Sequence, residues 1–272
     1  MRPQYFKKKV REIIESNEKY YNFNREERNL AAIFYHTLLM DKNLDKFLNK
    51  IEYTERFNNN DVEIYFEYAY LRDRWSLIDK DDDVTKKKLI LDILNPENKQ
   101  ELEKKSLREF NSYFGAKRAP SSDYIVSPAN WSITSFYNNI KDNMDFEKAC
   151  ILKWCFNAKP DIVIKTSPTK AICIEAKLES GIGSYPTSAS EKKIYRDRGC
   201  SDMNQLELQR ILMEEILGYE TEFVTIVKNS PRNKVDNSFK SITWDEVFAD
   251  VDMSENPTFI KEWLRKQIRT SH

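Results

Sequence analysis

The chain has 272 residues with 44 acidic and 44 basic side chains, so its formal net charge is zero. A content of 40% hydrophobic and 12% aromatic residues is that of a folded protein, and the length allows one large domain or two small ones. Only two histidines and five glycines are present, which argues against histidine-rich zinc sites and against glycine-rich nucleotide-binding loops. Without net charge, any binding of nucleic acid requires a local basic surface.

The sequence predicts a protein that does not insert into a membrane. The longest uncharged, mostly apolar run inside a helical pattern, residues 29–40, is well short of the roughly 20 residues that cross a bilayer. The lysines at positions 7–9 precede no apolar segment, so no signal peptide is predicted. The four cysteines form no CxxC pair, and buried free thiols are expected. These features favour a cytoplasmic location.

The first half of the sequence is predicted to be helical. Asn24 and Glu27 have the spacing of a capping box in front of an amphipathic pattern. A segment with Pro and Ser over 119–128 is the predicted boundary between an all-helical N-terminal region, residues 1–118, and a second domain, residues 129–272. The other helices predicted here cover 62–78, 85–94, 99–113, 131–140 and 146–156.

After residue 160 the pattern changes to short strands. Two β-branched runs, 161–165 and 171–177, are separated by Ser-Pro-Thr-Lys and predict a hairpin. A polar segment over 179–201 is predicted to be an exposed loop, followed by a helix over 204–217. The remaining predicted elements are a strand over 222–227 and helices over 243–248 and 257–268. The expected fold class is therefore α/β (α+β), a mixed sheet flanked by helices and preceded by an all-helical region.

Two carboxylates and a lysine are expected to lie together on the hairpin. Alternation along a strand puts Glu175 and Lys177 on one face of the second strand. The registers that keep the isoleucines of both strands on one face set Asp161 opposite Glu175 or Lys177. Two carboxylates beside a lysine suit a divalent cation and the hydrolysis of a phosphodiester. An ordinary ion pair on an edge strand is the alternative interpretation.

Pro160-Asp161 followed by Glu175-Ala176-Lys177 resembles the motif of the PD-(D/E)xK nuclease superfamily, to which restriction-endonuclease-like proteins belong. The resemblance covers under a third of the chain and implies a restriction-endonuclease-like fold. It implies that Asp161, Glu175 and the main-chain carbonyl of Ala176 bind Mg²⁺, for which Mn²⁺ substitutes. It also implies that Lys177 assists the attacking water.

The same resemblance indicates two helper residues. Many members carry a glutamate on the helix before the first strand, and Glu147 stands in that place as a further metal ligand. A solvated helix charge is the alternative for Glu147. The exonuclease-like branch often carries a Gln-x-x-x-Tyr helix after the lysine. Gln205 fits its first position and is expected to assist the site, but Gln209 stands where the tyrosine would be.

A basic stretch in the predicted loop beside the site is a candidate for binding nucleic acid. Its cations are interleaved with tyrosines, which suits contacts with phosphates and stacking on bases. A solvated run of charges is the alternative interpretation. The residues are Lys192, Lys193, Arg196 and Arg198.

The sequence and the resemblance together predict a Mg²⁺-dependent endonuclease that hydrolyses DNA, in a restriction or phage-defence system. The N-terminal helical region is expected to serve recognition or partner binding. One alternative is a catalytically idle nuclease-like subunit that binds DNA or proteins within a larger complex, and another is a helical adaptor. The expected partners are DNA, with RNA left open, and a second copy of the chain or a protein of a defence complex.

Overall fold

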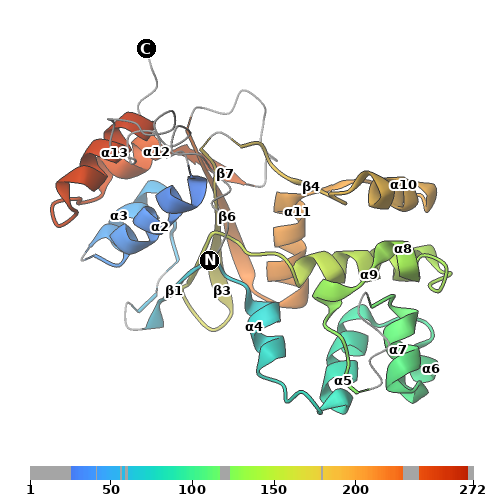
Figure 1. The fold of residues 1–272 in the computed structure, drawn as a ribbon. Coiled ribbons are helices and arrows are strands. Elements are labelled where there is room, and N and C mark those ends of the chain that lie inside the picture. The colour runs from blue at the N-terminus through green and yellow to red at the C-terminus, as the bar shows by residue number, and fades with distance from the viewer. Residues whose placement is uncertain are drawn as a thin grey trace, which may run out of the picture.

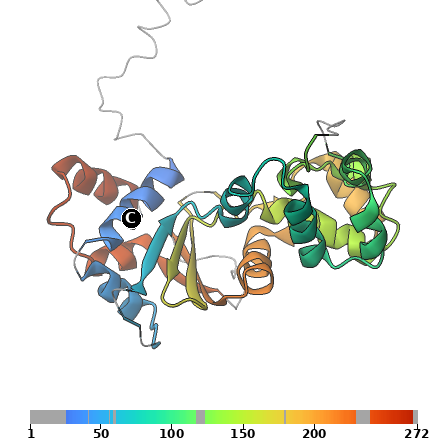
Figure 2. The ribbon, with the colours of Figure 1, turned by 90° about the horizontal axis from the view of Figure 1, so that it is seen from below.

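The computed structural model describes residues 26–40, 42–55, 57–58, 61–116, 123–178, 180–228 and 239–268. They form a five-stranded mixed sheet with helices on both faces and a helical lobe beside it (Figures 1 and 2). The sheet has the order β1 (Glu63–Phe66), β2 (Ile162–Lys165), β3 (Lys170–Ala176), β6 (Glu220–Val227) and β7 (Lys240–Thr243). Within these ranges, no helix combines the length and apolar character needed to cross a membrane.

Strands β2 and β3 form the predicted hairpin. The register pairs Ile162 with Ile174 and Ile164 with Ile172, so the isoleucines of both strands share one face, as expected. β1 pairs with the other side of β2 in antiparallel fashion, while β6 and β7 continue the sheet beyond β3 as parallel strands. The prediction of a mixed α/β structure is confirmed.

The isoleucine face of the sheet is covered by helices from both ends of the chain. Phe34 lies at the centre of this layer, with ring centroids 5.2 Å from Phe47 and 5.7 Å from Trp244 in edge-to-face contacts. Burying each such ring contributes roughly 1.5–3 kcal/mol, which anchors the N-terminal helices to the sheet. The covering helices are α2 (Glu27–Leu38), α3 (Asn43–Lys50), α12 (Trp244–Asp250) and α13 (Thr258–Ile268).

The opposite face of the sheet carries Cys173 and packs against the helical segment that begins at Gln205. α11 (Gln205–Arg210) places Leu206 on this face, and a π-helical segment, Ile211–Ile216, adds Met213. The helix ends before Gly218, whose φ of 72° lies in the left-handed region that favours glycine. The predicted helix over 204–217 is thereby confirmed.

The helical lobe is built from two separate insertions into the sheet topology. The second insertion, between β3 and α11, contains β4 (Ser184–Tyr185), α10 (Ala189–Asp197) and β5 (Met203–Asn204). Its Tyr195 packs 5.2 Å from Trp154 of the first insertion, so the two insertions share one core. The first insertion joins β1 to β2 and contains α4 (Tyr70–Ser76), α5 (Asp83–Leu94), α6 (Lys99–Lys104), α7 (Leu107–Tyr113), a short 3₁₀ helix (Pro128–Asn130), α8 (Ile133–Phe136) and α9 (Asn143–Cys155).

The prediction of an all-helical N-terminal region was wrong. The segment 62–78, predicted as one helix, contains β1 as well as α4, because pairing with β2 selects the extended conformation for its first part. The predicted boundary over 119–128 does not separate two packed units either. Of the elements before it, β1 belongs to the sheet, α2 and α3 pack on the sheet, and α4 to α7 belong to the helical lobe.

Three local predictions also differ from the structure. Residues 99–113 form two helices, because Ser106 caps the second one in a capping box with Glu109. The predicted loop over 179–201 contains α10, which Ser188 caps. The capping box predicted for Glu27 is not part of this helix start, since α2 begins at Glu27 itself and Asn24 lies outside the described residues.

Candidate active site

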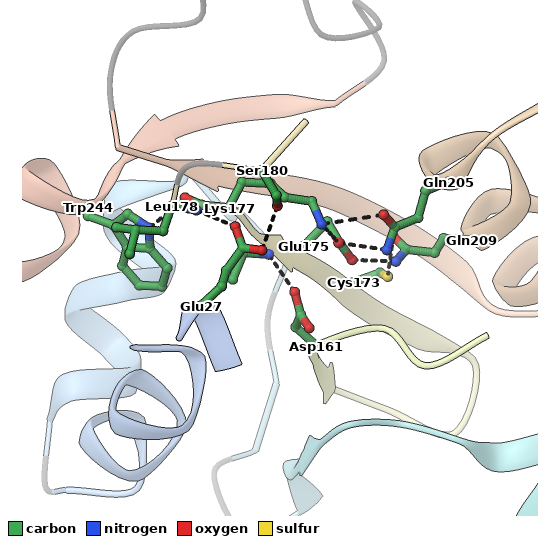
Figure 3. Close-up of polar contacts among 11 residues, drawn as sticks. Glu27, Asp161, Cys173, Glu175, Lys177, Leu178, Ser180, Gln205, Gln209 and Trp244 are labelled. Carbon is green, nitrogen blue, oxygen red and sulfur yellow. Dashed lines mark hydrogen bonds and ion pairs between the residues drawn. The ribbon is translucent and has the colours of Figure 1, made fainter. Parts of the chain in front are cut away.

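Asp161, Glu175 and Lys177 lie together where β2 begins and β3 ends (Figure 3). The hairpin register, continued by one residue, sets Asp161 opposite Glu175, which is one of the two predicted pairings. The main-chain nitrogen of Ala176 donates a 2.8 Å hydrogen bond to Asp161 Oδ2, and Lys177 Nζ lies 2.5 Å from Glu175 Oε1. The structure therefore brings the side chains of the motif to one place.

Glu175 is a buried carboxylate, with 1% of its surface exposed. Gln205 Nε2 donates a 2.7 Å hydrogen bond to Oε1, and Gln209 Nε2 donates a 2.5 Å bond to Oε2. Lys177 adds its ammonium group to Oε1. A buried carboxylate is tolerated only when it is paired and hydrogen-bonded, so these three donors hold Glu175 in one orientation.

Gln209 belongs to this site although the sequence analysis treated it only as a departure from the motif. It lies one helical turn after Gln205 on α11 and is 2% exposed. Its Oε1 is 3.9 Å from Cys173 Sγ, and burial raises the pKa of that thiol well above its ordinary value. Because the thiol stays protonated and donates, the amide oxygen faces Cys173 and the amide nitrogen faces Glu175. The sequence signal was the i, i+4 spacing of the two glutamines.

Asp161 is a buried carboxyl group close to a second carboxylate. Burial, followed by the charge of Glu175, raises the pKa of Asp161 to about 7, while the hydrogen bond from Ala176 opposes this rise. Burial by itself would lower the pKa of Lys177, but Glu175 outweighs it and the net shift is upward. Lys177 thus stays cationic, and the carboxylates outnumber the cations that face them.

Glu27 is a further acid at this site, which the sequence analysis missed. From the first turn of α2, its carboxylate accepts hydrogen bonds from the main-chain nitrogen of Leu178 and, at 2.6 Å, from Ser180 Oγ. Trp244 Nε1 donates a 2.9 Å bond to the carbonyl of Lys177, so the chain leaving β3 is held from two helices (Figure 3). α2 and α3 are the helices that precede the first strand of the sheet, and this was not predicted because β1 was not recognised.

Glu147 lies elsewhere. Its Oε1 accepts a 3.2 Å hydrogen bond from the hydroxyl of Tyr195 inside the helical lobe. In the part of the chain that the structure describes, no three Asp, Glu, His or Cys side chains are placed to share a metal ion. Glu147 is therefore not brought together with Asp161 and Glu175.

Comparisons with protein-family models, curated proteins and solved structures find no match for this chain. The chemistry of the site is accordingly inferred from its own residues.

The donor set suits a hard divalent cation. Asp161 and Glu175 offer carboxylate oxygens, and Asp161 Oδ1 accepts no hydrogen bond from the described residues. The N–H of Ala176 faces Asp161, and because the N–H and C=O of a strand residue point toward the same neighbour, its carbonyl lies on that side too. Oxygen ligands and unbalanced negative charge are what Mg²⁺ and Mn²⁺ require, so the residues fit such an ion.

Lys192, Lys193 and Arg196 lie on α10 and Arg198 directly follows it, and the two arginines are engaged within the protein. Arg196 forms a salt bridge of 2.5 Å with Asp202. Arg198 donates a 2.6 Å hydrogen bond to the carbonyl of Ile140 and stacks 4.7 Å from the ring centroid of Phe146. The two lysines remain more available: Lys192 Nζ is 3.4 Å from Ser184 Oγ, and Lys193 is exposed.

Proposed function

We propose that this chain is a metal-dependent nuclease of the PD-(D/E)xK kind with a restriction-endonuclease-like fold. The observation that carries the proposal is the meeting of Asp161, Glu175 and Lys177 at the ends of the β2–β3 hairpin. Support also comes from Gln205, which contacts both Glu175 and, at 3.4 Å, Lys177. The substrate we propose is DNA and the setting a restriction or phage-defence system, both inferred from the resemblance.

Asp161 and Glu175 would hold the Mg²⁺ ion, with the carbonyl of Ala176 on the same side. Bound there, the ion would supply Lewis-acid stabilisation of the charge that develops on the phosphate. Glu27, which adds to the upward pKa shift of Asp161 after burial and Glu175, replaces Glu147 as the third acid of the proposal. Oε1 of Glu175 already accepts from two donors and Oε2 from one, so Oε2 keeps a lone pair that could bind a metal ion.

Lys177 would serve the reaction as a fixed cation. Its side chain is 14% exposed and stays charged, since the pKa is raised by Glu175 against the effect of burial. With Glu175 holding the ion, the ammonium group would be placed to orient a water molecule and to offset charge on a phosphate oxygen. Gln205 remains beside it to receive one of its hydrogen bonds.

A second candidate function is that of a catalytically idle subunit that binds DNA or proteins. One observation favours it: both oxygens of Glu175 are engaged by protein donors. Under this alternative the ion pair between Glu175 and Lys177 is purely structural.

A cleavage assay separates the two functions. Supercoiled plasmid and labelled oligonucleotides are incubated with the protein in Mg²⁺, in Mn²⁺ and in EDTA. We expect cleavage in either metal and none in EDTA. Lys177→Ala should remain folded and lose most of the cleavage, whereas Lys170→Ala, a lysine at the other end of β3, should cut like the wild type. Metal-dependent cleavage that survives Lys177→Ala would contradict the assignment of that residue.

Thermal melts across a Mn²⁺ titration test the metal site without any substrate. A cation that binds only the folded protein raises its melting temperature by mass action. Asp161→Asn removes a ligand charge, so this variant should gain less stability from Mn²⁺ than the wild type. Equal gains in the two proteins would show that Asp161 is no ligand and would favour the idle subunit.

A further inference from the structure

A small cavity lined by tyrosines opens next to the candidate active site. It has a volume of ≈ 270 Å³ and lies between the end of β1, the start of α4 and Lys165 of β2. Known ligand pockets span roughly 300–1,000 Å³, so this cavity suits one ring system better than a whole cofactor. Three tyrosines, Tyr65, Tyr68 and Tyr70, form its wall.

The tyrosine cavity is on the same face of the sheet as Glu175. Tyr65 pairs with Val163 and Val163 pairs with Cys173, and residues paired across strands share a face. Neighbouring strands are about 4.8 Å apart, so β1 lies roughly 10 Å from β3 across this face. The segment that follows β1 is also tied to the motif, since the main-chain nitrogens of Glu67 and Tyr68 donate 2.8 and 2.9 Å bonds to the residues at 161 and 160.

The three tyrosine rings form a row in which Tyr68 contacts both of the others. Tyr68, 7% exposed, lies in the middle, with ring centroids 5.4 Å from Tyr65 and 5.7 Å from Tyr70. The outer rings are 38% and 40% exposed and are therefore available to a further flat ring. Offset stacking on such surfaces stabilises a complex beyond the area it buries.

Of the charged side chains that line the tyrosine cavity, the two carboxylates are paired with arginines outside it, while Arg74 has no carboxylate partner among the described residues. Glu67 is paired with Arg28 at 2.7 Å, and Asp73 is paired with Arg72 at 3.2 Å. Among the described residues no carboxylate pairs with Arg74, which is exposed on the cavity wall. Aromatic rings beside a free guanidinium group complement a ligand that joins a flat ring to an anionic phosphate.

We propose that the tyrosine cavity binds an unpaired nucleotide of the nucleic-acid substrate, with its base on Tyr65 or Tyr70 and its phosphate near Arg74. The inference rests on the proposed nuclease function and makes it more specific. A base inside a duplex is stacked on its neighbours and cannot reach a protein ring unless it leaves the helix. The substrate class is therefore nucleic acid with a single-stranded segment, such as a flap, a frayed end or a gap, next to the cleaved bond.

The test measures binding in EDTA, so that it does not depend on cleavage. The probe is a single-stranded oligodeoxynucleotide with one 2-aminopurine, whose fluorescence is quenched when the base stacks on an aromatic ring. We expect quenching by the wild type and roughly tenfold weaker binding for Tyr65→Ala and Tyr70→Ala. Tyr65→Phe and Tyr70→Phe should bind like the wild type, because they keep the ring and the fold. Phe259→Ala, at an exposed ring on α13, is the control outside the cavity.

The outcomes distinguish this inference from the proposed function. If the wild type cleaves nucleic acid in Mg²⁺ but the alanine variants bind the probe as tightly as it does, the inference is overturned and the nuclease function stands. If the wild type stacks the probe and never cleaves, the nuclease function falls while the nucleotide site remains. If the alanine variants change only the oligomeric state in sedimentation, the cavity is a protein interface and the inference is overturned.

Discussion

The main-chain amide of Ala176 donates a 2.8 Å hydrogen bond to Oδ2 of Asp161, which ties the second half of the sequence motif to the first. This bond favours the ionised form of Asp161, yet burial and the charge of Glu175 dominate and raise its pKa to about 7. Asp161 is consequently a carboxyl group that changes its charge near neutral pH when no cation is present.

The first prediction concerns the pH dependence of stability. In the unfolded chain Asp161 ionises near its ordinary pKa of 3.8, but in the folded protein it keeps its proton until about pH 7. Between these values the folded state binds the extra proton, so the metal-free protein should lose stability as the pH rises. Asp161→Asn should lack this decline and exceed the wild type by on the order of 2–4 kcal/mol above pH 7. Denaturant unfolding from pH 4 to pH 8 in EDTA measures the difference, and parallel curves would contradict it.

The second prediction concerns Gln209 as a support of Glu175. Gln209→Met keeps the length of the side chain but leaves Glu175 Oε2 without its donor. A buried acceptor without a partner costs about 1–3 kcal/mol, and more when it is charged. Gln267→Met replaces a buried glutamine of α13 on the other side of the sheet and serves as the control. The free energy of unfolding should drop more for Gln209→Met, and the half-saturating Mn²⁺ concentration should shift in that variant alone.

The third prediction compares the two helical glutamates. Glu27→Gln removes a charge beside Asp161 and alters the contacts with Leu178 and Ser180. We expect it to lower metal-dependent cleavage about 10–100-fold, as changes in the surroundings of metal ligands commonly do. Glu147→Gln should leave the cleavage rate near that of the wild type, because Glu147 contacts Tyr195 in the lobe. The measurement is the initial cleavage rate of both variants at saturating Mg²⁺. A larger loss of rate in Glu147→Gln than in Glu27→Gln would show that Glu147 acts at the site and Glu27 does not.

The fourth prediction separates structural from ligand-binding cations on α10 and at its C-terminal end. Arg198→Met removes hydrogen bonds to main-chain carbonyls of the lobe, so it should cost about 1–3 kcal/mol of stability. Its effect on the salt dependence of DNA binding should be negligible. Lys193→Met should leave stability unchanged and, if the exposed ammonium group meets a phosphate, reduce the slope of log affinity against log salt by roughly one. A loss of salt dependence in Arg198→Met would contradict the structural role.

The parts of the fold that depend on local pattern could be predicted from the sequence. The alternating isoleucines of β2 and β3 predict both strands and restrict their register to two pairings, because only these keep the isoleucines on one face; the structure adopts one of them. The same register brings Asp161 opposite Glu175, so the centre of the site followed from the hairpin. Gln205 could be proposed from its place in the motif, and it does contact Glu175.

The parts that depend on long-range pairing could not be predicted in this way. β1 has only four residues, Glu63–Phe66, in a stretch that also suits a helix, and its partner β2 lies about a hundred residues later. Because β1 was not predicted, β2 was taken as the first strand, and the glutamate on the preceding helix was expected to be Glu147 instead of Glu27. Gln209 was not predicted because its i, i+4 spacing from Gln205 does not by itself identify a partner, and only its buried contact with Glu175 shows its role.

The first insertion separates β1 from its partner strand β2 in the sequence, and this has a consequence for folding kinetics. Glu63 and Lys165 are 102 residues apart in sequence, yet they are joined by a 2.7 Å bond at the β1–β2 junction. Closing a loop of that length before its interior has collapsed is entropically unfavourable, and pairings between distant segments slow folding. The helical insertion therefore has to become compact first, which brings its two ends together and lets β1 join the edge of the sheet late. Substitutions in β1 should then accelerate unfolding while leaving the folding rate almost unchanged.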